Sequence, residues 1–174
     1  MNAPVFVDTN VFLYARDAGE PAKQPRAAVW VEHLLRERAG RTSMQVLSEY
    51  YVNVTRKLDP GLPPDEAWDD VTALFAWRPQ AIDESLLRRG REIEKRHRLS
   101  WWDSLVVAAA QLQDCGLLLS EDLQDGGVYG SVTVRNPFTF AQREPLLSYA
   151  AAAPATGVHR PRGRPKRPAI GSAA

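Results

Sequence analysis

The chain contains little cysteine and little histidine. Its 174 residues include one cysteine, Cys115, so no internal disulfide can form, and this fits a reducing, cytoplasmic compartment. The three histidines, His33, His97 and His159, are too widely scattered to suggest a zinc site. We therefore expect neither a disulfide scaffold nor zinc chemistry.

Long apolar runs are also missing. The most extended one, around residues 105–110, is far shorter than the roughly 20 residues needed to span a bilayer. The amino terminus has no basic flank and carries Asp8 within its apolar segment, unlike a secretory signal. We expect no association with membranes.

The near-zero net charge hides two unlike parts. Five basic residues follow position 154 with no acid beside them. The rest of the chain therefore holds 17 of the 22 basic residues and all 21 acidic ones, a net charge of −4. After Tyr149 the composition changes to Ala, Pro, Gly and Arg, which cannot bury enough apolar surface to fold. The sequence predicts a mildly acidic domain over 1–148 and a disordered basic tail over 149–174.

Hydrophobic periodicity predicts alternating elements along the domain. Helical spacing covers residues 22–39, 44–58, 64–77, 83–97 and 100–114, whereas short buried strands fit 5–7, 117–119 and 131–135. Trp68 is among the apolar positions of the helix over 64–77. Strands separated by helices need crossover connections, so the fold class is α/β with a mostly parallel sheet.

Four acidic residues occupy positions where such a sheet binds ligands. Asp8 follows the first strand, Asp122 follows the strand at 117–119, and Asp103 lies in the first turn of the helix between 100 and 114. Glu49 lies at the polar margin of its helix. Because ligands bind outside the carboxyl ends of parallel strands, these side chains could converge on one cleft.

Converging carboxylates raise one another's pKa unless a cation neutralises them. Oxygen ligands without His or Cys suit Mg²⁺ or Mn²⁺, ions that can clamp a phosphodiester and activate water. Each acid alone has an ordinary alternative: Asp8 and Asp122 as caps, Asp103 as the capping partner of Ser100, and Glu49 as a solvated helix residue.

Taken together, four segments resemble the PIN-domain nucleases, and among them the VapC-type toxins of toxin–antitoxin pairs. The match runs from about position 4 to 140, through residues 6–15, 45–51, 100–110 and 118–126. The resemblance implies a PIN-like three-layer fold, with a twisted, mostly parallel sheet of four to five strands flanked by helices. It further implies Mg²⁺- or Mn²⁺-dependent endonucleolytic cleavage of RNA, a homodimer and a cognate antitoxin.

The resemblance assigns the catalytic and metal-binding acids as Asp8, Glu49, Asp103 and Asp122. We expect Asp8 and Asp103 to bind the principal ion directly, with Glu49 and Asp122 completing the shell or holding a second ion. The fourth position is the most variable in the family, so the adjacent Glu121 is an alternative to Asp122.

Two polar residues also fall on positions that support the family's site. Asn10 and Ser120 are expected to act as hydrogen-bond donors to the acids rather than as metal ligands.

The tail carries a second resemblance, to the AT-hook, which binds A·T-rich DNA through its minor groove. The matching residues are Arg160, Arg162, Gly163, Arg164, Pro165 and Lys166. The ordinary alternative is a disordered, solubilising tail. A second hypothesis for the whole protein follows: a catalytically weak PIN-like module acting as a DNA-bound regulator through its antitoxin and tail.

Overall fold

The computed structural model describes residues 3–139. The expected boundary near residue 148 and the AT-hook-like segment at 160–166 lie outside these residues.

A five-stranded sheet forms the centre of the molecule. Its strands are β1 (Val5–Val7), β2 (Gly40–Arg41), β3 (Leu117–Leu119), β4 (Val128–Tyr129) and β5 (Val132–Arg135), in the order β2-β1-β3-β5-β4. All neighbouring strands are parallel except β4 and β5, which are antiparallel. The predicted α/β class and mostly parallel sheet are confirmed. The two-residue strands β2 and β4 were not expected, because so short a run carries no periodicity.

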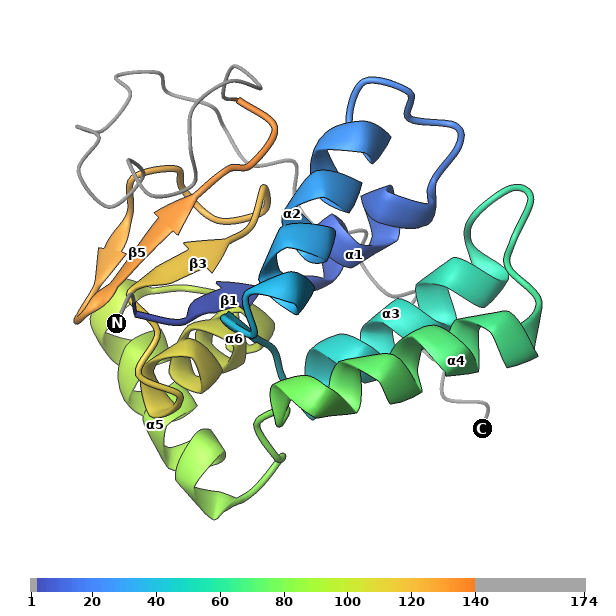
Figure 1. Ribbon diagram of the computed structural model, residues 1–174. Coiled ribbons are helices and arrows are strands. Elements are labelled where there is room, and N and C mark those ends of the chain that lie inside the picture. Colours follow the sequence, from blue (N-terminus) through green and yellow to red (C-terminus); the bar gives the residue numbers. More distant parts are fainter. Residues whose placement is uncertain (1–2, 140–174) are drawn as a thin grey trace, which may run out of the picture.

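Helices flank this sheet. They are α1 (Thr9–Arg16), α2 (Gln24–Arg36), α3 (Met44–Arg56), α4 (Pro64–Leu74), α5 (Glu84–His97) and α6 (Trp101–Leu112), with a short 3-10 helix at Phe75–Trp77. α5 and α6 pack together on one side of the sheet, α1 and α2 lie on the other, and α3 and α4 run side by side beyond β1 (Figure 1). Within residues 3–139, no helix combines the length and apolarity that crossing a membrane requires.

The core lies between the sheet and the helices. Phe6 and Leu118, on adjacent strands, are fully buried, as are Val107 and Ala108 of α6. Each large apolar side chain buried in this way contributes roughly 1.5–3 kcal/mol to stability. Trp68 does not belong to this core: 53% of its surface is exposed on α4.

The start of β2 depends on a glycine. A Cβ atom at Gly40 would lie 2.4 Å from the ring of Trp77, so no larger residue fits there.

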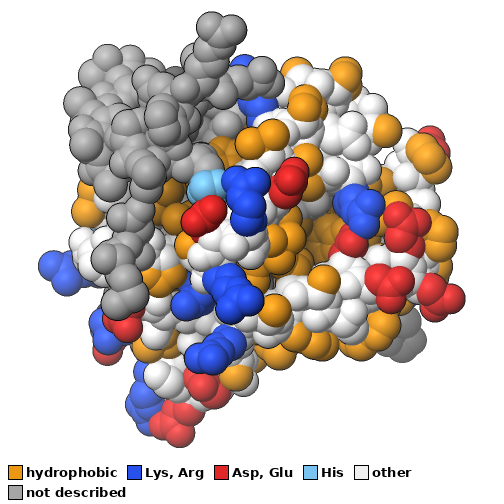
Figure 2. Space-filling model, viewed as in Figure 1, with side chains coloured by type: hydrophobic (Ala, Val, Ile, Leu, Met, Phe, Trp, Pro, Cys, Tyr) orange, Lys and Arg blue, Asp and Glu red, His pale blue; other side chains and the backbone are white. Residues whose placement is uncertain are grey.

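The surface of α4 has one dominant sign of charge. Acidic side chains gather over its first turns (Figure 2), where the sequence places Asp65, Glu66, Asp69 and Asp70. The two in the first turn favour the helix because they lie at the positive end of its dipole.

Candidate active site

The carboxyl ends of β1 and β3 lie next to each other. Val7 is in register with Leu119, and the backbone N–H of Asp8 donates to the carbonyl of Leu119 at 3.0 Å. The chain passes from β1 to β2 on one side and later returns to β3 on the other, so strand order reverses here. Such a switch point opens a crevice in a parallel sheet.

Asp8 occupies this crevice and is only 4% exposed. Its carboxylate caps α1, accepting from the backbone N–H of Thr9 at 2.7 Å. It also accepts from the Ser120 hydroxyl at 2.8 Å. Asp8 therefore caps α1, as its sequence position suggested, but its carboxylate also has another hydrogen-bond partner.

Asn10 joins Asp8 to the end of β3. Its Nδ2 donates to Asp8 Oδ2 at 3.3 Å, to Ser120 Oγ at 3.3 Å and to Asp122 Oδ2 at 3.2 Å. Its Oδ1 accepts from the Glu121 backbone N–H at 3.4 Å. The positions expected to donate to the acids thus do so, and they draw Asp122 towards Asp8.

Glu49 reaches the same crevice from α3. The Ser43 hydroxyl caps this helix, and the Thr42 hydroxyl donates to the carbonyl of Val7, which ties the start of α3 to the end of β1. Glu49 then accepts from the Thr9 hydroxyl at 3.4 Å and from Gln45 Nε2 at 3.2 Å.

Thr9 and Gln45 are site residues that sequence reasoning missed. Gln45 lies four residues before Glu49, a spacing that places both on one helix face and could have revealed the contact. Thr9 carries no comparable pattern, because its partner lies 40 residues away.

Electrostatics sets Asp8 apart. Burial raises its pKa from 3.8 to about 7, and the nearby charges of Asp122 and Glu49 add to the rise, although the hydrogen bonds from Ser120 and Thr9 oppose it. No Lys or Arg between residues 3 and 139 forms an ion pair with Asp8. Three of the four predicted acids thus share one electrostatic environment.

Asp103 stands apart from this network. Its backbone N–H donates to Ser100 Oγ at 3.1 Å, and the Ser100 hydroxyl donates to its carboxylate at 2.6 Å, so the capping interaction predicted as an alternative is present. α6 runs back along β3 through a short connection and, at about 1.5 Å per residue, reaches beyond the strand's end. Asp103 therefore lies towards the same edge of the sheet. Burial of Tyr129 raises the pKa of its hydroxyl, and the charge of Asp103 adds to this rise.

Glu121, the alternative fourth acid, is already neutralised. Lys23 Nζ lies 2.8 Å from its Oε2, and the Tyr14 hydroxyl donates to its Oε1 at 2.6 Å. Lys23 also lies 4.1 Å from the centre of the Tyr14 ring. This arrangement turns Glu121 towards α1 and α2, whereas Asp122 is the acid that contacts Asn10.

Comparison with family models matches residues 5–124 to the PIN domain. This match spans more than half of the chain and includes the segments that carry all four acids. The chain belongs to the PIN domain family, a family of nucleases.

Comparison with solved structures finds a partial likeness. The solved structure of the Mycobacterium tuberculosis toxin VapC20, described as cleaving the sarcin–ricin loop, is similar with a TM-score of 0.49 and 20% sequence identity, over 66% of this chain and 86% of that one. No curated protein matches the sequence.

The donor set of this PIN domain suits a hard divalent cation. Its acids offer only oxygen, and the most buried of them, Asp8, faces like charges without a basic partner. Within residues 3–139, however, no three acidic, His or Cys side chains form a ready-made ligand cluster. Glu49 and Asp103 instead accept hydrogen bonds from nearby donors, Gln45 and Ser100. Binding of a cation therefore requires these side chains to reorient.

Proposed function

We propose that this PIN domain is a Mg²⁺- or Mn²⁺-dependent endoribonuclease and the toxin of a toxin–antitoxin pair. The observation that carries the proposal is the buried, uncompensated carboxylate of Asp8 at the sheet's switch point, with the charges of Glu49 and Asp122 acting on it. Repulsion between these carboxylates does not stabilise the fold, whereas the same cluster of negative charge attracts a divalent cation.

The residues divide the work as follows. Asp8 and Asp103 would hold the principal ion, while Glu49 and Asp122 complete its surroundings. When bound, the cation would lower the pKa of an attacking water and stabilise the charge that develops on the phosphodiester oxygens. No side chain is needed as a nucleophile.

The neutral residues orient the acids. Ser120 and Asn10 donate to the same oxygen of Asp8, Oδ2, while the Thr9 N–H holds the other oxygen, Oδ1. With Oδ2 fixed by two donors, the carboxylate cannot rotate freely, so its remaining lone pairs have a defined direction. Asn10 does the same for Asp122.

The remaining partners follow from the resemblance to VapC-type toxins. We propose RNA as substrate, a cognate antitoxin that covers the acidic crevice, a homodimeric assembly and a cytoplasmic location. Observing whether the neighbouring coding sequence specifies a short antitoxin-like protein would test the second of these.

The decisive experiment incubates the purified full chain with total RNA, with and without Mg²⁺ or Mn²⁺, and maps the ends produced. We expect discrete internal cuts that require the cation and disappear in the Asp8→Asn variant. Cuts that persist in that variant, or no cuts with either ion, would contradict the proposal.

The same experiment distinguishes the nuclease proposal from the alternative hypothesis, a catalytically weak regulator. That hypothesis expects no cleavage but tight, sequence-dependent binding of A·T-rich duplex DNA through the tail. Substituting Arg162→Ala and Arg164→Ala in the full chain and repeating the DNA titration would show whether the tail is responsible.

A further inference from the structure

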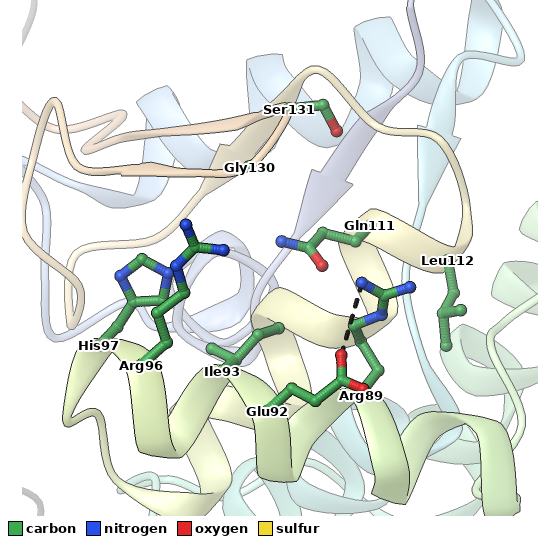
Figure 3. A pocket seen from close by; sticks show the side chains of 9 residues that line it. All are labelled: Arg89, Glu92, Ile93, Arg96, His97, Gln111, Leu112, Gly130 and Ser131. Carbon is green, nitrogen blue, oxygen red and sulfur yellow. Dashed lines mark ion pairs between the residues drawn. The ribbon is translucent and has the colours of Figure 1, made fainter.

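A cavity of about 340 Å³ lies between α5, α6 and the turn that joins β4 to β5 (Figure 3). This volume lies within the range of natural ligand pockets. Its charged and polar lining residues are Arg89, Glu92, Arg96, His97, Gln111 and Ser131. Basic groups outnumber acidic ones here, in contrast to the acidic crevice at Asp8.

Arg96 is the exceptional residue of this cavity. Along α5 the other arginines are neutralised by neighbours: Arg88 lies 2.7 Å from Glu84, Arg91 lies 2.6 Å from Glu94, and Arg89 lies 3.7 Å from Glu92. Arg96, by contrast, forms no ion pair or hydrogen bond with any residue from 3 to 139.

Its surroundings leave Arg96 open to a ligand. The side chain is exposed, and its guanidinium group points into the cavity beside His97 and towards the amide of Gln111 (Figure 3). A guanidinium group in this position can direct its planar N–H donors towards a phosphate.

Tyr129 packs beside two of the residues that line the cavity. The ring of His97 packs edge-on against that of Tyr129, with centroids 5.0 Å apart, and Gln111 Nε2 donates to the Tyr129 carbonyl at 2.9 Å. Tyr129 is paired with Val132 at the start of β5, so this side of the cavity lies at the amino ends of the parallel strands, away from the edge where Asp8 lies.

We propose that this cavity binds a backbone phosphate of the RNA substrate, away from the phosphate that is cleaved, with Arg96 as its main contact. This inference rests on the proposed function. The acidic crevice repels a polyanion, so affinity for RNA must come from basic groups at a separate place. His97, Gln111 and Ser131 supply further hydrogen-bond donors around the same space.

The test measures binding of a short fluorescent single-stranded RNA by full-length Asp8→Asn protein in Mg²⁺, over a range of salt concentrations. Adding Arg96→Gln should raise Kd about three- to tenfold and make the logarithmic salt dependence shallower by about 0.7, the value for one lost phosphate contact. Arg91→Gln is the matched control, because it removes the same charge from the same helix outside the cavity. We expect no change in salt dependence for this control.

Cleavage assays with otherwise wild-type chains complete the test. Arg96→Gln should lower kcat/KM about three- to tenfold through KM and leave kcat unchanged, and His97→Gln should act in the same direction. If Arg96→Gln and Arg91→Gln behave alike while the wild type cleaves RNA, the phosphate site is wrong and the nuclease proposal stands. If RNA binding depends on Arg96 but the wild type cleaves nothing, the nuclease proposal fails and the cavity remains an RNA-binding site.

Discussion

Two carboxylates at opposite ends of α1 have contrasting partners. Asp70 of α4 receives the Arg16 guanidinium, whose Nε lies 2.8 Å from its Oδ2, together with the hydroxyl of Tyr50. Asp8 also receives a hydroxyl, from Ser120, but its other partners are a backbone N–H and an amide. One acid is neutralised within the fold and the other is not.

This difference separates a structural carboxylate from a functional one. At the Asp70 end, the hydrogen bond with the carboxylate raises the pKa of Arg16, so the charged guanidinium is stabilised, and the contacts tie α1, α3 and α4 together. At the Asp8 end, burial and like charges raise the pKa to about 7, so the ionised form is disfavoured until a cation arrives. Perturbed, uncompensated acids of this kind mark functional sites.

The largest expected effect comes from exchanging the two acids for their amides and measuring RNA cleavage. Asp8→Asn should lower kcat about 10³-fold, since it removes a charge needed to stabilise the transition state. Asp70→Asn should leave kcat within about twofold at a temperature where it is folded, because Asp70 is far from the chemistry.

Circular dichroism of both variants provides the control, since each should retain the wild-type spectrum. Equal losses of kcat in two folded variants would remove the functional distinction between the two acids.

A second prediction concerns the pH dependence of stability. The folded-state pKa of Asp8 lies above its ordinary value of 3.8, so the folded protein holds this proton more tightly than the unfolded chain. Between about pH 4 and pH 7 the free energy of unfolding should therefore fall as pH rises, by on the order of 4 kcal/mol from this group.

Urea unfolding of the wild type and Asp8→Asn across this range measures the effect as a difference between the two proteins. The variant should lack this slope and be more stable than the wild type at pH 8 without metal. Adding Mn²⁺ at pH 8 should raise the Tm of the wild type but not of the variant. Parallel pH profiles for the two proteins would show that Asp8 ionises normally in the fold.

The third prediction measures the structural role of Asp70. Asp70→Asn should lower the free energy of unfolding by about 1–2 kcal/mol, because Arg16 loses a charged partner in a partly buried position. Glu66→Gln is the matched control: Glu66 lies 3.5 Å from the same guanidinium but is more exposed, so its loss should cost no more than about 0.5 kcal/mol. Equal effects would mean that Arg16 stabilises the fold only through general surface charge.

Local sequence signals predicted most of the fold. Ser43, Asp83 and Ser100 each cap a helix that apolar spacing had already indicated, so several independent preferences agreed. Helical spacing groups Trp68 with the apolar positions of α4, but it does not show whether another element covers that face, and 53% of Trp68 is exposed. The strands β2 and β4 could not be predicted from the sequence, because such short strands depend on contacts with other parts of the fold, such as the approach of Trp77 to Gly40.

The candidate site was less accessible to sequence reasoning. The acids and the supporting residues Asn10 and Ser120 could be placed through the family resemblance, but their contacts join residues up to 112 positions apart. Spacing did indicate that Asp103 could engage Ser100. The pairing of Glu121 with Lys23 cannot be deduced from spacing, because it depends on which side chains face each other across packed elements.

The smallest expected effect concerns Glu121 and Asp122, two neighbouring acids in one loop that differ in the same way as Asp70 and Asp8. Glu121 has a basic partner, Lys23, as Asp70 has Arg16, whereas Asp122 contacts Asn10, which also binds Asp8. Asp122→Asn should weaken Mn²⁺ binding, measured by calorimetry at pH 8, about fivefold through loss of one nearby charge. Glu121→Gln should change that affinity by less than about twofold, because Lys23 already offsets its charge. The reverse order would identify Glu121 as the fourth ligand and would require the Lys23 pair to open when the cation binds.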